Sequence, residues 1–315
     1  MNLITKIGMT TYYNAVEMLL KMMGYDRDRI FTLAKFLGFL RYNFGYVGKG
    51  KSKEEFLKMI SQVFPEKSLK DHEDILRDFW IMHQKSFLDF FMAYRLNKEN
   101  FKNYFEYEGF DNIDSALGNG KGAILTTFHY GDGRILHIGL SLKGYPVNIL
   151  SSKYTEYSKM GREVRLRTSR KFHKVYYEGE SMRWMYKTLE NNEIVFMSIT
   201  AFAGNKGVFL DGLGSKIYLS TAPVRLALKT GAPIIPAVAT REARGIVKIY
   251  IRNPLTLERS GNQQKDLELN TGKLLNILEE FVFRYPAQHD WRVWFIRIKE
   301  AEELFQKKVE NVRNK

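Results

Sequence analysis

The chain of 315 residues carries 49 lysines and arginines against 35 aspartates and glutamates, a formal net charge of +14, and it has no cysteine. An apolar fraction of 44% is sufficient for a substantial core, and the lack of cysteine excludes disulfides, cysteine-ligated zinc and thiol nucleophiles. The positive charge favours an anionic partner, such as a phosphorylated substrate, an anionic membrane surface or nucleic acid.

The N-terminal segment is amphipathic and interrupted by charge. Residues 1–24 include charged side chains and no small-residue cleavage site, so a signal peptide is not expected. No stretch of the chain reaches the eighteen or so uninterrupted apolar residues that a spanning helix needs. Residues 12–23 and 30–46 combine aromatic, apolar and basic residues. We expect them to lie on a membrane surface or to cover a core or a partner.

Two capping boxes predict helices in the first third of the chain. Ser52-x-x-Glu55 and Ser68-x-x-Asp71 begin these helices, and Pro65 separates them. Apolar and aromatic residues recur at helical spacing along the second helix: Leu76, Trp80, His83, Phe87, Phe91 and Tyr94. We interpret this stripe as core, and His83 as a packing histidine whose hydrogen bonds are satisfied.

From residue 118 onward, short apolar strands alternate with helices. The expected strands are residues 123–128, 147–150, 175–177, 194–199, 234–239 and 247–251. The expected helices are residues 134–142, 221–230 and 266–284. This alternation predicts an α/β fold with a mixed, largely parallel sheet flanked by helices. The expected divisions are a helical N-terminal region at 1–115, an α/β core at 116–300 and a charged C-terminal tail at 301–315.

A candidate catalytic base follows the first of these strands. The strand runs into the turn His129-Tyr-Gly-Asp-Gly-Arg134, after which a helix begins. Because open α/β sheets bind their ligands at the carboxyl ends of parallel strands, this position suits a general base. The alternative is a turn histidine held by a structural hydrogen bond.

The most basic segment, residues 153–174, holds eight lysines and arginines against two glutamates. Because arginine clamps phosphate bidentately, this segment is a candidate anion-binding platform, and a solvated helix face is the alternative. The arginines predicted to bind substrate there are Arg162, Arg165, Arg167 and Arg170. No standard groove-binding or RNA-binding signature accompanies the positive charge, so nucleic acid is the less favoured of the anionic partners.

The order of several motifs resembles the lipid A late acyltransferases, a branch of the lysophospholipid acyltransferase superfamily. The resemblance covers about residues 41–297. Its elements are the helical lead-in, Ala116-Leu-Gly-Asn-Gly-Lys-Gly122, the strand before His129, the basic segment, the strand 194–199, Gly207-Val-Phe-Leu-Asp-Gly-Leu-Gly214, the helix 221–230, Gly231-Ala-Pro-Ile-Ile-Pro236, and His289-Asp-Trp291-Arg-Val-Trp294. No Walker loop, dinucleotide fingerprint, nucleophile elbow or HExxH spacing competes with this assignment, so a metal enzyme is not expected.

The resemblance implies a glycerolipid acyltransferase-like fold and acyl transfer. A fatty acyl group would pass from an acyl-carrier-protein or coenzyme A thioester to a hydroxyl of a lipid or glycolipid. The protein would be cytoplasmic and peripheral on the inner membrane, with the acyl thioester as co-substrate and no cofactor. His129 would take the proton of the acceptor hydroxyl, and nearby donors would stabilise the oxyanion.

The sequence departs from the family pattern at Arg134. The family pattern is histidine, four residues and then Asp or Glu, and a cation in place of that acid disfavours the imidazolium ion. Three interpretations stay open. Asp132 supplies the carboxylate; or a distant carboxylate, Asp211 or Glu156, reaches His129 while Arg134 binds an anionic group; or the activity is altered, leaving a lipid-binding or partner-binding protein. Both aspartates also suit ordinary turns.

Two further features have a structural and a functional interpretation. The loop 203–207 with Lys206 supplies either donors beside the reacting centre or only a hairpin connection. Trp291 and Trp294 could flank an acyl tunnel, lie at the membrane interface or pack in the core. We prefer the packing interpretation.

Overall fold

The structure is a computed structural model that describes residues 15–45, 52–151, 171–177, 181–201, 204, 206–242 and 245–313. The helices are residues 15–22, α2 (Arg27–Phe44), α3 (Lys53–Val63), α4 (Leu69–Met92), α5 (Asp111–Gly118), α6 (Gly133–Leu142), α8 (Arg183–Glu190), α9 (Ala222–Thr230), α10 (Gln263–Arg284) and α11 (Trp291–Arg313), with 3-10 turns η1 (Ala93–Arg95), η2 (Phe101–Asn103) and η5 (Pro286–Gln288). The strands are β1 (Phe105–Glu108), β2 (Ala123–Thr127), β3 (Val147–Ser151), β4 (Lys174–Tyr177), β5 (Ile194–Ser198), β6 (Gly207–Gly212), β7 (Ser215–Ser220), β8 (Ile234–Arg241) and β9 (Val247–Ile251).

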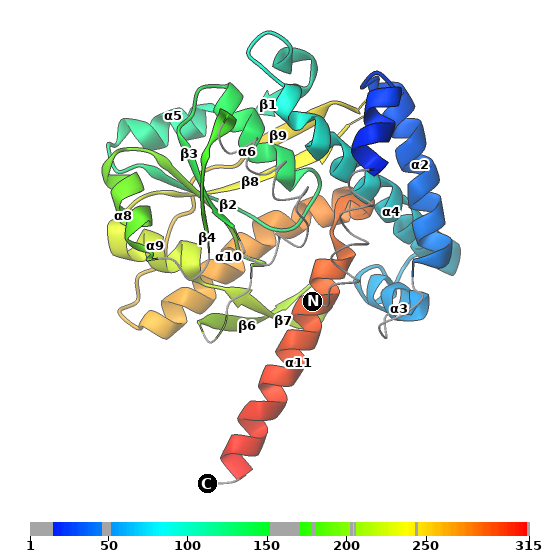
Figure 1. The fold of residues 1–315 in the computed structure, drawn as a ribbon. Coiled ribbons are helices and arrows are strands. Elements are labelled where there is room, and N and C mark those ends of the chain that lie inside the picture. The colour runs from blue at the N-terminus through cyan, green and yellow to red at the C-terminus, as the bar shows by residue number, and fades with distance from the viewer. Residues whose placement is uncertain are drawn as a thin grey trace.

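Seven strands form one sheet in the order β1-β9-β8-β2-β5-β3-β4 (Figure 1). All neighbours are parallel except β8 and β9, which are antiparallel. The predicted α/β class with a mixed, largely parallel sheet is therefore confirmed. Strand β1 precedes residue 116, so the sheet takes an edge strand from the segment expected to be helical. Strands β6 and β7, which the strand pattern did not predict, form a separate antiparallel hairpin.

Helices cover both faces of the sheet, because its central strands are apolar on both sides. Along β2, Ile124 points into one core while Leu125 points into the other, and Val195 and Phe196 of β5 alternate in the same way. Helices α5 and α6 pack on one face, and α8, α9 and α10 pack on the other. Full burial of each such side chain stabilises the fold by about 1.5–3 kcal/mol.

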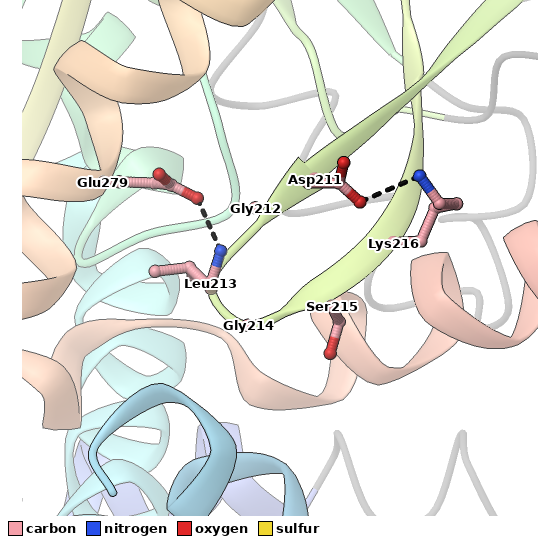
Figure 2. A pocket seen from close by; sticks show the side chains of 7 residues that line it. All are labelled: Asp211, Gly212, Leu213, Gly214, Ser215, Lys216 and Glu279. Atoms are coloured by element: carbon pink, nitrogen blue, oxygen red, sulfur yellow. Dashed lines mark hydrogen bonds and ion pairs between the residues drawn. The ribbon is translucent and has the colours of Figure 1, made fainter. Parts of the chain in front are cut away.

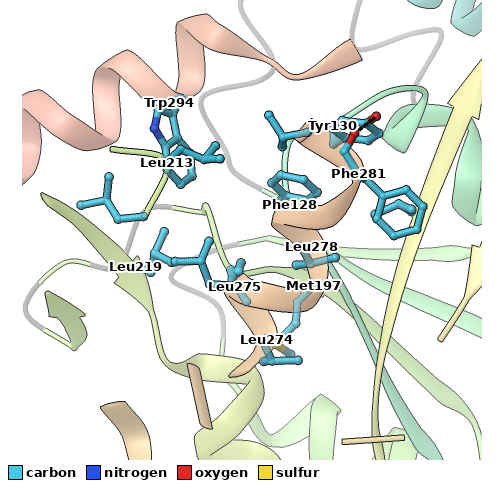
Figure 3. Close-up of a cluster of buried hydrophobic side chains, with 14 of the residues drawn as sticks. Phe128, Tyr130, Met197, Leu213, Leu219, Leu274, Leu275, Leu278, Phe281 and Trp294 are labelled. Carbon is cyan, nitrogen blue, oxygen red and sulfur yellow. Dashed lines mark hydrogen bonds between the residues drawn. The ribbon is translucent and has the colours of Figure 1, made fainter. Parts of the chain in front are cut away.

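The second of these cores also anchors the segment after β2. Figure 3 shows Phe128 and Tyr130 of that segment gathered with leucines of α10 and with Trp294 of α11. Trp294 and Trp291 have no exposed surface, so packing, the preferred interpretation of both residues, is confirmed. The hydroxyl of Tyr130 donates to the carbonyl of Phe281 at 2.8 Å, which fixes the segment to α10.

The N-terminal helices pack on one side of the α/β core (Figure 1). Both predicted capping boxes are present, at Ser52 with Glu55 and at Ser68 with Asp71. Residues 15–22, α2 and α4 share a small apolar core of their own. None of the described helices combines the length and the hydropathy that crossing a bilayer requires.

Buried ion pairs join these helices to the sheet. The Arg241 guanidinium, at the end of β8, lies 2.6 Å from Asp89 of α4 and 2.5 Å from Asp132 at the start of α6. Burial alone would lower the pKa of Arg241, but the charges of the two carboxylates outweigh it and raise that pKa. Arg27 of α2 lies 3.4 Å from the same Asp89. The network therefore links α2, α4, α6 and β8.

Candidate active site

The turn that follows β2 is held by backbone hydrogen bonds from two other segments. The Gly131 N–H donates to the Gln288 carbonyl at 2.7 Å, and the Asp132 N–H donates to the Ala239 carbonyl at 3.0 Å. Gly131 has a φ of +51°, and a Cβ at this position would lie 1.8 Å from the Ala239 carbonyl oxygen. Only glycine lets the turn approach β8 this closely. The turn fixes where His129 stands.

His129 lies at the carboxyl end of β2, beside the residues that follow β5. Its Nδ1 is 2.6 Å from the Thr200 hydroxyl, and its backbone N–H donates to the same oxygen at 3.0 Å. The Thr200 hydroxyl also lies 3.0 Å from that of Ser198. Within the described part of the chain, His129 Nε2 has no hydrogen-bond partner, and His129 is exposed to solvent. One ring nitrogen is thus anchored, while the other is open.

The protein environment favours the neutral imidazole of His129. Desolvation is the main cause, and it lowers the pKa to about 4. Arg134, Arg297 and Arg292 act in the same direction, whereas Asp290 opposes them. Because His129 is exposed, solvent offsets part of the desolvation, but the direction of the shift is common to burial and to all three arginines. A neutral imidazole at neutral pH is the form that accepts a proton.

The carboxylate that acts on His129 comes from a distant part of the chain. Asp290 precedes α11, and its backbone N–H donates to the His129 carbonyl at 3.0 Å. Arg292 grips its carboxylate through Nε at 3.1 Å and Nη2 at 2.8 Å. Burial opposes the ionised form of Asp290, but Arg292, His83 and His129 together lower its pKa below the usual range. The ionised form of Asp290 is therefore favoured beside the turn.

Asp132, the predicted local partner, is directed away from this role. Its side chain is buried and forms the ion pair with Arg241. Among the described contacts, none joins Asp132 to the imidazole of His129. Asp132 and His129 are close in sequence, but the Asp132 carboxylate pairs with the buried guanidinium of Arg241.

Arg134 is exposed in the first turn of α6, close enough for its charge to lower the pKa of both His129 and His83. His83 packs against Trp80 and Phe79, as the aromatic stripe predicts. Both of its ring nitrogens are buried, and neither has a hydrogen-bond partner among the described residues. Burial, the largest cause, lowers its pKa well below the usual range.

No described contact joins the other predicted residues to His129, and most of those residues fall outside the described ranges. Arg162, Arg165, Arg167, Arg170 and Glu156 lie outside the described residues. The backbone carbonyl of Lys206 accepts a hydrogen bond from Thr221 at 2.6 Å. No group of three or more His, Asp or Glu side chains in the described ranges is arranged to hold a metal ion.

Asp211 lies instead in an exposed depression at the β6–β7 turn. Figure 2 shows it paired with Lys216, at 2.8 Å, on the hairpin itself. On the other side of the depression, Glu279 of α10 accepts the Leu213 N–H at 2.8 Å. Burial raises the pKa of Glu279 to about 7. His129 is not among the residues that line this depression.

Thr200 and Asp290 are the site residues that the sequence did not reveal. Thr200 follows an apolar strand without any motif, and Asp290 stands in the Trp-rich motif whose two tryptophans we assigned to packing. Position offers one signal for Thr200, since β5 is the parallel neighbour of β2 and both strands end at the same edge. Nothing in the sequence signals that Asp290 meets His129.

The sequence of this chain is similar to those of known acyltransferases. A model of the bacterial lipid A biosynthesis acyltransferase family matches residues 2–296. Phosphatidylinositol mannoside acyltransferases from two strains of Mycobacterium tuberculosis, CDC 1551 / Oshkosh and ATCC 25618 / H37Rv, are each 26% identical over 140 residues. That match covers 44% of this chain and 44% of each relative, so the chain spans less than half the length of the curated relatives it matches.

One solved structure shows a weak likeness. The 1-acyl-sn-glycerophosphate acyltransferase of Thermotoga maritima matches with a TM-score of 0.36 and 14% identity, over 72% of this chain and 97% of that one.

The close approach at Gly131 gives a stability prediction. Gly131→Ala should lower the free energy of unfolding by about 2 kcal/mol or more, because it adds a positive-φ penalty to the contact with the Ala239 carbonyl. Gly133→Ala is the matched control, because a Cβ there meets nothing within 4 Å, and it should change stability by under about 1 kcal/mol. Urea denaturation of the two variants measures this difference. Equal effects would contradict the tight-turn explanation.

Proposed function

The chain belongs to the bacterial lipid A biosynthesis acyltransferase family, and from that premise we propose that it moves a fatty acyl group from an acyl thioester to a hydroxyl of a lipid or glycolipid. The donor in this proposal is an acyl carrier protein or coenzyme A thioester, and His129 is the general base. The observation that carries the proposal is the imidazole at the carboxyl end of β2, anchored through Nδ1 and open at Nε2.

The proposed reaction uses His129 twice. Nε2 takes the proton of the acceptor hydroxyl while the oxygen attacks the thioester carbonyl carbon and forms a tetrahedral oxyanion. The oxyanion then collapses, the carbon–sulfur bond breaks, and the imidazolium returns the proton to the departing thiolate. This mechanism requires a base that is neutral before the reaction, and burial and the surrounding arginines both favour that form.

We assign the binding of anionic groups to Arg134, whose charge acts on His129, and to the basic segment at residues 153–174. Arg134 is exposed and its field reaches the histidine, so it suits a phosphate or carboxylate on either substrate. The arginines between residues 162 and 170 extend this proposal, with Lys206 as a further predicted substrate contact. An excess of positive charge also suits an anionic substrate or an anionic membrane surface.

The proposed site of action is the cytoplasmic surface of the inner membrane, with the N-terminal helices as the docking surface. Large apolar side chains stand exposed on residues 15–22 and on α2: Met18, Leu19, Met22, Phe36, Phe39 and Phe44. Exposed basic side chains accompany them: Lys21, Arg29, Lys35 and Arg41. Apolar groups that insert beside cations suit an anionic bilayer.

One observation favours a second candidate function, a lipid-binding or partner-binding protein without turnover. No carboxylate in the described part of the chain is hydrogen-bonded to the His129 ring, and Arg134 occupies the position of the family's acid. A protein of this kind would bind acyl donors or lipids without consuming thioester.

The first test compares wild type with His129→Ala. Each protein is incubated with acyl carrier protein or coenzyme A thioesters and a total lipid extract, and thioester loss and new acylated lipids are followed by mass spectrometry. We expect a product with wild type and a loss of at least about 1,000-fold in the variant, whose melting temperature should be unchanged. A variant that keeps its activity refutes His129 as the base. Wild type that consumes neither thioester supports the binding protein.

The membrane proposal predicts the effect of charge on the α2 face. Phe36→Glu with Phe39→Glu should weaken binding to vesicles containing phosphatidylglycerol by about tenfold or more, because two exposed apolar side chains are replaced by anions. Phe305→Glu, at an exposed position of α11, is the matched control and should bind as wild type does. Co-sedimentation with vesicles measures both, and equal losses would place the docking surface elsewhere.

A further inference from the structure

We propose that Thr200 and Asp290 divide the work that a single acid does in the family pattern: Thr200 orients the His129 ring, and Asp290 supplies the negative charge. The proposal rests on the proposed function, since it concerns the same base. Both are positioning residues that act through His129.

The hydroxyl of Thr200 is surrounded by hydrogen-bonding groups of the site. It lies at the end of β5, is almost fully buried, and lies within hydrogen-bonding distance of three groups: the His129 backbone N–H, His129 Nδ1 and the Ser198 hydroxyl. A hydroxyl offers one donor and two acceptors. In the tautomer that we propose, Nδ1–H and the backbone N–H both donate to Thr200, and Thr200 donates to Ser198, so that all three positions are filled. The Thr200 N–H in turn donates to Ser198 at 3.2 Å.

This arrangement leaves the lone pair of His129 on Nε2. A proton held on Nδ1 by Thr200 makes Nε2 the accepting atom, and Nε2 has no hydrogen-bond partner among the described residues. A carboxylate at the same place would fix the same tautomer. The hydroxyl therefore replaces the orienting part of the acid, but it carries no charge to stabilise imidazolium.

The missing charge comes from Asp290. Its backbone is hydrogen-bonded to the His129 carbonyl, and Arg292 holds the carboxylate ionised. The other charged groups that act most strongly on His129 are Arg134 from α6 and Arg292 and Arg297 from α11, all of the opposite sign. Arg297 is itself paired with Glu300 at 2.5 Å. Asp290 is thus the carboxylate that offsets the arginines when His129 gains a proton.

Such a division explains how Arg134 can stand in the position of the family's acid. The orienting bond comes from the residues that follow β5 and the counter-charge from the segment before α11, so the first turn of α6 need not supply an acid. Arg134 then places a positive charge near the base, and that charge favours substrates with an anionic group.

The orienting role is tested by Thr200→Val against Thr200→Ser. Valine keeps the shape and removes the hydroxyl, so kcat should fall about 10- to 100-fold with little change in KM, while serine should keep kcat within about threefold. The 15N shifts of the His129 ring should show protonated Nδ1 in wild type and the serine variant, and a mixture of tautomers with valine. Unchanged tautomers in Thr200→Val, or equal losses of kcat in both variants, overturn the proposal. The NMR result stands even if no thioester is consumed, so it separates this inference from the proposed function.

The charge role is tested by Asp290→Asn, which preserves the hydrogen bond from the Val293 N–H at the start of α11. Asp290 raises the pKa of His129, and its loss also leaves Arg292 unopposed, so both effects lower that pKa. The acid limb of kcat/KM, and the titration of the His129 ring followed by NMR, should move to lower pH. Asp74→Asn, at a half-exposed ion pair on α4, is the control and should not move it. A limb that stays in place or moves to higher pH overturns the assignment.

Discussion

The buried guanidinium of Arg241 is the interaction on which the rest of the structure depends. It pairs with Asp89 of α4 and Asp132 of α6, while the backbone of the same residue exchanges two hydrogen bonds with the Gln288 side chain. Removing one partner of such a network leaves an uncompensated buried charge, which costs about 3–5 kcal/mol. Arg241, at the end of β8, therefore fixes the positions of the N-terminal helices, the turn after β2 and η5 relative to one another.

This relative placement of the elements gives the candidate site its geometry. Gly131 fits between the Ala239 and Gln288 carbonyls, and the turn sets His129 against Thr200 on one side and Asp290 on the other. None of these contacts lies within a single element, since they join β2, β5, β8 and the segment before α11. Preorganisation of the imidazole therefore comes from the sheet and the buried charges together, rather than from the loop that carries it.

Arg134 shows how a local departure can be absorbed by distant residues. A cation in the first turn of α6 disfavours imidazolium, and burial adds to that effect. The Asp290 carboxylate acts against both, held ionised by Arg292. Asp132, one residue from the glycine of the turn, is taken by Arg241 instead. Nearness in sequence does not decide which carboxylate serves the histidine, because the strongest buried charge nearby competes for it.

The sequence by itself determined the local structure: the two capping boxes, the helix that ends at Gly231, the alternation of strands and helices, and the place of His129 at a strand end. These features depend on side-chain periodicity and on short-range hydrogen bonds, which neighbouring residues encode. Only the tertiary structure decided that β1 joins the sheet, that Asp132 faces Arg241, and that Thr200 and Asp290 meet His129. Those contacts join residues between 71 and 161 positions apart or compete for one buried charge, and no local pattern records the outcome of that competition.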